Sequence, residues 1–202
     1  MTAFHLFPEV RKDSQFAKPV KEINSEADVA IFNASVACDR ILAFILLLNE
    51  SVKGKTCLDQ DIHRSQNTEG ILELLDVFES WIVAIPPSTG PRRFGNVAFR
   101  QWIARLEEVW TWKKAADCKE GPGLLYNYMP QDCHPALVEI TPYLLGAFGS
   151  GQRLDYGTGH ELSFAAFLCT LFLLRVLDPA QDAVAAALVI FPKYKFHSPQ
   201  LT

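Results

Sequence analysis

The chain has 202 residues, of which 49% are hydrophobic and 21% are charged, a composition that excludes disordered, collagen-like and mucin-like proteins. Lysine and arginine number 19 against 23 aspartates and glutamates, which gives a formal net charge of −4 and argues against a nucleic-acid binder with a broad basic face. The length is sufficient for one compact domain with a core of its own.

The five cysteines are widely spaced, include no C-x-x-C pair and follow an N-terminus without the apolar segment of a signal peptide. This pattern favours a reducing compartment, the cytoplasm, with thiols packed as small core residues and with no metal site. The strongest apolar run, 162–174, is shorter than the ~18 to 20 residues of a bilayer span. We therefore expect a buried helix there and no membrane partner.

In chain order, residues 1–23 lack clean periodicity and predict an extended or loosely docked arm. Ser25 and Asp28 have the spacing of a capping box, and apolar residues then recur at helical spacing, so one helix is expected from Ser25 to about Glu50. A second helix is expected over 68–83, ending before the proline pair 86–87. Its predicted inner stripe is Ile71, Leu72, Leu75, Phe78 and Ile82.

The rest of the chain also predicts helices. The aromatic residues and arginines of 92–102 could stack nucleic-acid bases, but Phe99, Trp102 and Leu106 share one helical face and favour a core position. No segment alternates apolar and polar residues as a strand does, so an all-α fold is favoured over α/β. The further helices are expected over 96–114, from Pro135 onward, over 161–177 and from Pro179 to about Phe191.

Segment 149–161 combines charged residues with four glycines just ahead of the most apolar helix. Backbone N–H groups at glycines can approach a ligand closely, and a helix N-terminus attracts anions, so a phosphate could bind here with Arg153 as the countercharge. Alternatively, Thr158 and Glu161 form a capping box and the glycines only turn the chain. Spacing alone leaves both interpretations open and favours the capped turn.

Common catalytic motifs do not match this segment. His160 and Glu161 begin the metalloprotease pattern H-E-x-x-H, but Phe164 stands where the second histidine is required. The glycines of 157–159 lack the third glycine and the preceding strand of a dinucleotide-binding fingerprint. Neither the phosphate-binding pattern G-x-x-x-x-G-K-[ST] nor the hydrolase pattern G-x-S-x-G occurs in the chain.

Four blocks of sequence carry a family resemblance: WIVAIPP at 81–87, RFGNVAFRQW at 93–102, PYLL at 142–145 and RLDYGTGHELSFAAF at 153–167. In this order, from about Ser25 to Tyr194, they resemble the phosphotyrosyl phosphatase activator family. Its members activate the type 2A serine/threonine phosphatase and are also described as peptidyl-prolyl cis-trans isomerases, or rotamases. The resemblance implies an all-helical protein with a core, a linker and a lid.

The resemblance also implies effectors, partners and site residues. ATP and magnesium are effectors in the family, and the partners are the phosphatase 2A catalytic subunit and a proline-containing peptide, in the cytoplasm and also in the nucleus. The corresponding nucleotide-binding residues are Arg153, Thr158 and Gly159. The candidates for catalysis are Asp155, Tyr156 and His160, and the residues that shape the pocket loop are Gly157 and Glu161.

Family members continue beyond the Phe-x-x-Tyr element at 191–194 with a long helix and a G-S-H-G-V-W-G-L-D-D block that supplies magnesium ligands. This chain reads differently over 195–202, so the resemblance predicts a shortened member without those ligands. We expect an arm (1–23), an incomplete activator domain (24–194) and a divergent tail (195–202). Two functions follow: an activator with isomerase activity that assists ATP- and magnesium-dependent phosphatase assembly, or a truncated, non-catalytic helical interaction module.

Overall fold

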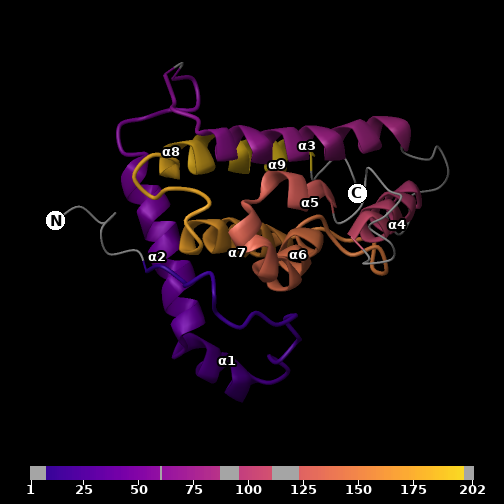
Figure 1. Ribbon diagram of the computed structural model, residues 1–202. Coiled ribbons are helices and arrows are strands. Elements are labelled where there is room, and N and C mark those ends of the chain that lie inside the picture. The colour runs from indigo at the N-terminus through magenta and orange to yellow at the C-terminus, as the bar shows by residue number, and fades with distance from the viewer. Residues whose placement is uncertain (1–7, 60, 87–95, 111–122, 198–202) are drawn as a thin grey trace.

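The computed structural model describes residues 8–59, 61–86, 96–110 and 123–197, and the regular elements in these ranges are helices, which confirms the predicted all-α class. In Figure 1, α3 lies along one edge of the molecule with α6 and α7 beneath it, and α2 leads down to α1. The α-helices are α1 (Glu26–Asn33), α2 (Val36–Ser51), α3 (Gln66–Ala84), α4 (Ala98–Trp110), α5 (Gly123–Tyr128), α6 (Leu137–Gly146), α7 (Thr158–Leu173), α8 (Ala183–Ala185) and α9 (Phe191–His197). A 3-10 helix, η2 (Gln131–Ala136), precedes α6, and a π-helical segment, η3 (Ala186–Ile190), joins α8 to α9.

The single helix expected from Ser25 to Glu50 is wrong, because the chain forms two helices, α1 and α2, bent by 61°. The capping box at the start of α1 is confirmed: the Ser25 hydroxyl accepts from the Asp28 N–H, and the Asp28 carboxylate accepts from the Ser25 N–H. A second cap causes the break, since the Ser35 hydroxyl accepts from the Cys38 N–H and starts α2 afresh. Within the described ranges, no helix alone has the length and apolar character to cross a membrane, and α1 with α2 reaches them only as a bent pair.

The cap at Ser35 has a measurable effect on stability. Ser35→Ala removes the acceptor for the Cys38 N–H and should lower the free energy of unfolding by about 1 kcal/mol in urea titrations. Ser35→Asn retains a capping side chain and should stay within about 0.5 kcal/mol of the wild type. Equal losses in both variants would show that the cap does not determine where α2 begins.

The helix expected over 68–83 is confirmed as α3 and is slightly longer at both ends. Its N-terminus is set by Ser65, whose hydroxyl accepts from the Thr68 N–H at 3.1 Å, and it ends at Ala84, before Pro86. Pro87 lies outside the described chain. All the predicted inner residues are buried: Ile71, Leu72, Leu75, Phe78 and Ile82.

Helix α4 begins at Ala98 rather than at residue 96, because the Asn96 side chain accepts a hydrogen bond from the Ala98 N–H. Phe99, Trp102 and Leu106 are buried, which confirms that this face belongs to the core. Residues 111–114 of the predicted helix lie outside the described ranges.

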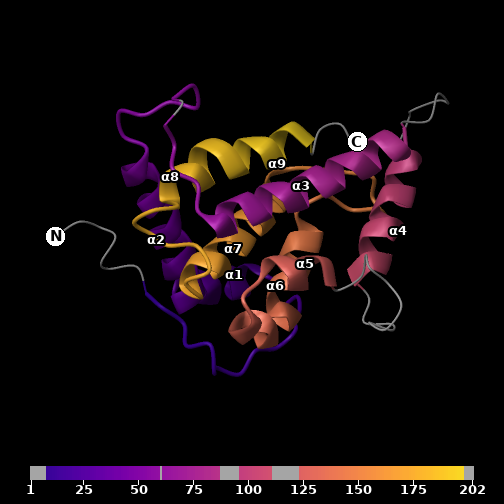
Figure 2. The same cartoon turned by 45° about the horizontal axis from the view of Figure 1, so that its top comes forward.

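The predicted ends of the last helices are wrong. α7 covers 158–173 instead of 161–177, and Arg175 just beyond it has a left-handed φ of 55° that a continuing helix does not allow. The final helix does not stop at Phe191, because α8, η3 and α9 follow one another without a gap as far as His197. In Figure 2, α9 lies beside α3, which it contacts.

The N-terminal arm contains no helix over 8–25. It is fixed to the helical body by the Val10 N–H, which donates to the Leu173 carbonyl at 2.8 Å, and by Lys12, whose amine lies 2.7 Å from the Asp132 carboxylate. The arm therefore covers the end of α7.

The expected buried helix is confirmed in α7, where Phe164, Phe167, Leu171 and Phe172 are each 0% exposed. Burial also raises the pKa of the Cys169 thiol on this helix from its usual 9.0 to about 12. Above pH 9 the unfolded chain releases this proton while the folded chain keeps it, so the unfolded state binds fewer protons and stability falls as pH rises.

The contribution of the Cys169 thiol to the free energy of unfolding is complete below about pH 9. It declines by about 1.4 kcal/mol per pH unit up to about pH 12. Urea titrations at pH 8 and pH 10 give the loss of unfolding free energy over this range. That loss should be about 1 kcal/mol smaller for Cys169→Ala than for the wild type. Cys57→Ala, at an exposed thiol, is the matched control and should leave the pH dependence unchanged. Equal pH dependence in both variants would contradict this origin.

Candidate functional site

The segment 149–161, called the signature loop below, is folded by a tight turn at its start. The Ser150 N–H donates to the Asp155 carbonyl at 3.0 Å, and the Leu154 N–H donates to the Ser150 carbonyl at 2.7 Å. Gly149 has a φ of 112°, and a Cβ there would lie 2.8 Å from both the Asp155 carbonyl oxygen and the Phe99 ring. Only glycine fits this position, because both the backbone conformation and the close approach exclude a side chain.

Three predicted residues of this loop, Arg153, Asp155 and His160, lie close together. The Arg153 Nε lies 2.9 Å from one Asp155 carboxylate oxygen, and the His160 Nε2 lies 3.8 Å from the other. The His160 Nδ1 lies 2.6 Å from the Gly146 carbonyl, which can only accept, so Nδ1 carries the proton. In the neutral imidazole Nε2 is then an acceptor, and its 3.8 Å separation from the Asp155 carboxylate is too long for a hydrogen bond.

Tyr156 completes the predicted catalytic group. Its ring is stacked on the His160 ring with centroids 5.8 Å apart and an interplanar angle of 20°. Its hydroxyl lies 2.9 Å from the hydroxyl of Tyr194 on α9. The structure thus places all the candidates for catalysis, Asp155, Tyr156 and His160, in one cluster at the start of α7.

The capping box expected at Thr158 and Glu161 is wrong. Gly157 is the N-cap residue of α7 and has no side chain, so Thr158 is already inside the helix and no side-chain hydrogen bond caps this end. The Glu161 carboxylate instead pairs with the Lys195 amine. Thr158 and Gly159 are exposed at this positive end of α7, where a helix favours an anion.

The predicted nucleotide residues Arg153, Thr158 and Gly159 therefore all belong to one solvent-facing loop. The Arg153 side chain is 67% exposed, so solvent surrounds most of it, and its guanidinium forms an ion pair with Asp155. A phosphate at this loop has to replace the Asp155 carboxylate as the partner of Arg153. The residues present fit an anionic group through an open helix end and a mobile guanidinium.

An open pocket of about 590 Å³ adjoins the loop, between α4 and the turn at 149–152. Arg100 on α4 lines it and donates from Nε to the Gly151 carbonyl at 3.3 Å. Ile103 forms its apolar side and would lie 3.1 Å from a Cβ at Gly151. Arg100 was not among the predicted site residues, although it belongs to the family block RFGNVAFRQW.

Helix α9 supplies two further residues, Tyr194 and Lys195, that were not predicted to belong to the site. The Tyr194 hydroxyl donates to the Ala147 carbonyl at 2.6 Å, just before the signature loop. Lys195 was placed in a divergent tail, yet its amine pairs with Glu161 and lies 5.6 Å from the centre of the Tyr156 ring. The Glu161 carboxylate raises the pKa of Lys195, so the amine remains charged at neutral pH.

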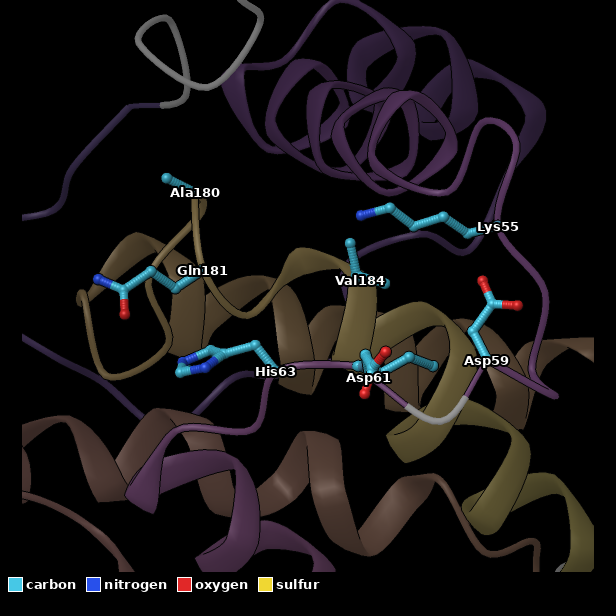
Figure 3. Close-up of a pocket in the computed structure, with 8 residues that line it drawn as sticks. Lys55, Asp59, Asp61, His63, Ala180, Gln181 and Val184 are labelled. Carbon is cyan, nitrogen blue, oxygen red and sulfur yellow. The ribbon is translucent and has the colours of Figure 1, made fainter.

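A larger open pocket, of about 740 Å³, lies between the α2–α3 connection and the start of α8 (Figure 3). Lys55 and Asp59 lie toward one end of it, and His63 and Gln181 lie toward the other. None of its lining residues belongs to the signature loop. The smaller pocket is lined by 149–152 of the loop, whereas the predicted nucleotide and catalytic residues over 153–160 do not line it. We therefore take the smaller pocket as the one next to the site.

Within the described ranges, no group of three or more histidine, cysteine, aspartate or glutamate side chains is placed to hold a metal ion such as magnesium. Asp155 is engaged by Arg153, and Glu161 is engaged by Lys195. We therefore assign no step to a metal bound by these residues.

Comparison with known proteins gives the same family as the sequence blocks. Residues 19–198 match the family model described as "Phosphotyrosyl phosphate activator (PTPA) protein". The match covers most of the chain, and the protein belongs to this family.

Curated relatives are named as phosphatase activators. The chain is 34% identical over 174 residues to a serine/threonine-protein phosphatase 2A activator of Drosophila melanogaster, covering 86% of this chain and 40% of the relative. It is 39% identical over 167 residues to activator 1 of Mycosarcoma maydis, covering 81% of this chain and 32% of the relative. The chain thus spans 40% of the first relative and 32% of the second.

A solved structure supports the fold. The crystal structure titled as the PP2A phosphatase activator Ypa1 matches with a TM-score of 0.80 and 30% sequence identity, covering 97% of this chain and 59% of that chain. The all-helical arrangement described above is therefore the arrangement of a family member.

Proposed function

We propose that the chain activates a type 2A serine/threonine phosphatase by contacting its catalytic subunit, in the cytoplasm and the nucleus, with the signature loop at the contact. The observation that carries this proposal is the folded signature loop itself, within a chain whose family match runs from 19 to 198. The names of the relatives add support, since each is called a phosphatase 2A activator.

We further propose that the loop binds the phosphates of ATP. The uncapped N-terminus of α7 offers backbone N–H groups at Thr158 and Gly159, and Arg153 can turn from Asp155 to the ligand. The adjoining pocket, with Arg100 at its wall, has room for the rest of a nucleotide. The phosphates of bound ATP would bring negative charge to the contact with the phosphatase. The residues of this chain would bind and orient the ATP.

Prolyl isomerisation is the second activity we propose for this cluster. Rotation about an X–Pro bond crosses a barrier of ~18 to 20 kcal/mol and needs a site that binds the twisted amide, rather than proton transfer to or from it. The Nδ1 proton of His160 is committed to Gly146, and the Tyr156 hydroxyl is committed to Tyr194. What remains for a proline is the aromatic surface of Tyr156 and the Nε2 acceptor of His160.

The test is reactivation of metal-depleted phosphatase 2A catalytic subunit with ATP and magnesium. Arg153→Ala should raise the ATP concentration for half-maximal reactivation by about tenfold, the usual scale for one charged contact with a phosphate. Arg11→Ala is the matched control, because Arg11 also pairs with an aspartate two residues on and is exposed, and it should behave as wild type. If phosphatase reactivation depended on ATP concentration in the same way for both variants, Arg153 would not belong to the nucleotide site.

Calorimetry separates this proposal from the non-catalytic interaction module. The module binds the phosphatase but not ATP, so titration of the folded chain with ATP should give no heat of binding in that case. Measurable ATP affinity that Arg153→Ala weakens and Arg11→Ala does not would support the activator.

A further inference from the structure

The side chain of Tyr194 lies in the core beneath the signature loop and is 0% exposed. Its ring is stacked on Phe164 of α7, with centroids 3.8 Å apart and an interplanar angle of 9°, and meets Phe148 edge-on at 5.6 Å. Burial raises the pKa of Tyr194, so the hydroxyl keeps its proton throughout the neutral range. A buried hydroxyl of this kind must place its one proton on a definite acceptor.

The neighbours of the Tyr194 hydroxyl fix the direction of its hydrogen bonds. The Ala147 carbonyl, at 2.6 Å, can only accept, so Tyr194 donates its proton there. The Tyr156 hydroxyl, at 2.9 Å, must then donate to the Tyr194 oxygen. The His160 carbonyl, at 3.3 Å, is a second and longer acceptor of the same Tyr194 proton.

One hydroxyl group therefore connects three positions around the signature loop. Ala147 lies just before the loop, Tyr156 lies within it, and His160 lies in the first turn of α7. The next residue of α9, Lys195, adds a link to Glu161 on the same turn. Helix α9 thus contacts the chain at both ends of the signature loop.

We propose that Tyr194 is a positioning residue for the signature loop: its hydroxyl sets the place of the Tyr156 ring and of the first turn of α7 relative to Ala147. Tyr194 touches no ligand in this scheme and acts through Tyr156 and the backbone of His160. Its effect on ATP binding rests on the proposed function, whereas its effect on the loop does not.

Hydrogen exchange of the full chain tests the positioning directly. Tyr194→Phe keeps the aromatic packing and removes only the hydroxyl, so amides of 150–160 should exchange about tenfold faster while those of α3 are unchanged. Tyr143→Phe is the matched control, because Tyr143 is a half-buried tyrosine of α6 whose hydroxyl makes no hydrogen bond within the described chain. It should leave exchange in the loop as in the wild type.

Tyr156→Phe provides a second route if the core substitution impairs folding, since it removes the donor on the half-buried partner. It should speed exchange of the same amides by about threefold, and combining it with Tyr194→Phe should add nothing to Tyr194→Phe alone. Effects of the two substitutions that simply add would show that the hydroxyls do not act through each other and would overturn the proposal.

The reactivation assay supplies a readout that a general loss of stability does not move. Well below its unfolding temperature, Tyr194→Phe should raise the ATP concentration for half-maximal reactivation by about three- to tenfold and keep the maximum. If wild type does not reactivate the phosphatase but Tyr194→Phe still speeds loop exchange, the positioning holds and the proposed function fails. If loop exchange in Tyr194→Phe matches that in Tyr143→Phe, the positioning fails, whatever reactivation shows.

Discussion

Phe148→Ala should lower the free energy of unfolding by about 3 to 5 kcal/mol. Phe148 is 0% exposed, and its ring centroid lies 5.2 Å from that of Phe78, 5.2 Å from that of Trp102 and 5.6 Å from that of Tyr194. These partners come from α3, α4 and α9, so alanine leaves a cavity where three helices meet under the signature loop. The surrounding rings cannot close that cavity, because each is held by its own helix.

Urea titration followed by circular dichroism measures the effect of Phe148→Ala. The matched control is Val83→Ala on α3, where the residue is 78% exposed and the change should stay within about 0.5 kcal/mol. A loss below about 1 kcal/mol for Phe148→Ala would show that the aromatic cluster does not join these helices as described.

Thr68→Val should lower the free energy of unfolding by about 2 to 3 kcal/mol, because it removes a hydrogen bond to a buried charge. Thr68 is 0% exposed, and its hydroxyl donates to an Asp182 carboxylate oxygen at 2.9 Å. Asp182 is itself only 2% exposed, and its other oxygen accepts from the Asp178 N–H at 2.8 Å. Valine has the shape of threonine but cannot donate, so one oxygen of a buried carboxylate loses its donor.

Thr68→Ser is the control for Thr68→Val, since it keeps the hydroxyl and loses a methyl group. It should lower the free energy of unfolding by about 1 kcal/mol, the scale of one buried methyl group. Serine and valine variants of equal stability would contradict the role of this hydrogen bond, which joins the start of α3 to the start of α8 across the fold.

The fold was largely predictable from the sequence because its helices have regular apolar stripes, as the burial of Ile71, Leu75 and Phe78 on α3 shows. The break between α1 and α2 was not, since the apolar spacing continues across it and Ser35 also fits a helix interior. The end of α7 was missed for a related reason: Leu174 and Val176 are buried outside the helix, so hydrophobicity does not mark the boundary.

The candidate site was predictable only in part. Composition and the family blocks identified Arg153, Thr158 and His160, which lie together on one loop. The choice between a capped turn and an open helix end depended on Gly157 being the N-cap residue, which spacing does not reveal. Tyr194 and Lys195 follow the loop by more than thirty positions, and only the packing of α9 against α7 brings them to it.

Reactivation of metal-depleted phosphatase 2A catalytic subunit by the purified wild-type chain is the most direct measurement of the proposed activity. We expect phosphatase activity to return in the presence of ATP and magnesium, in proportion to the chain added, and to need more ATP with Arg153→Ala than with Arg11→Ala. A cooperatively folded wild-type chain that restores no activity at any ATP concentration would contradict the proposed function.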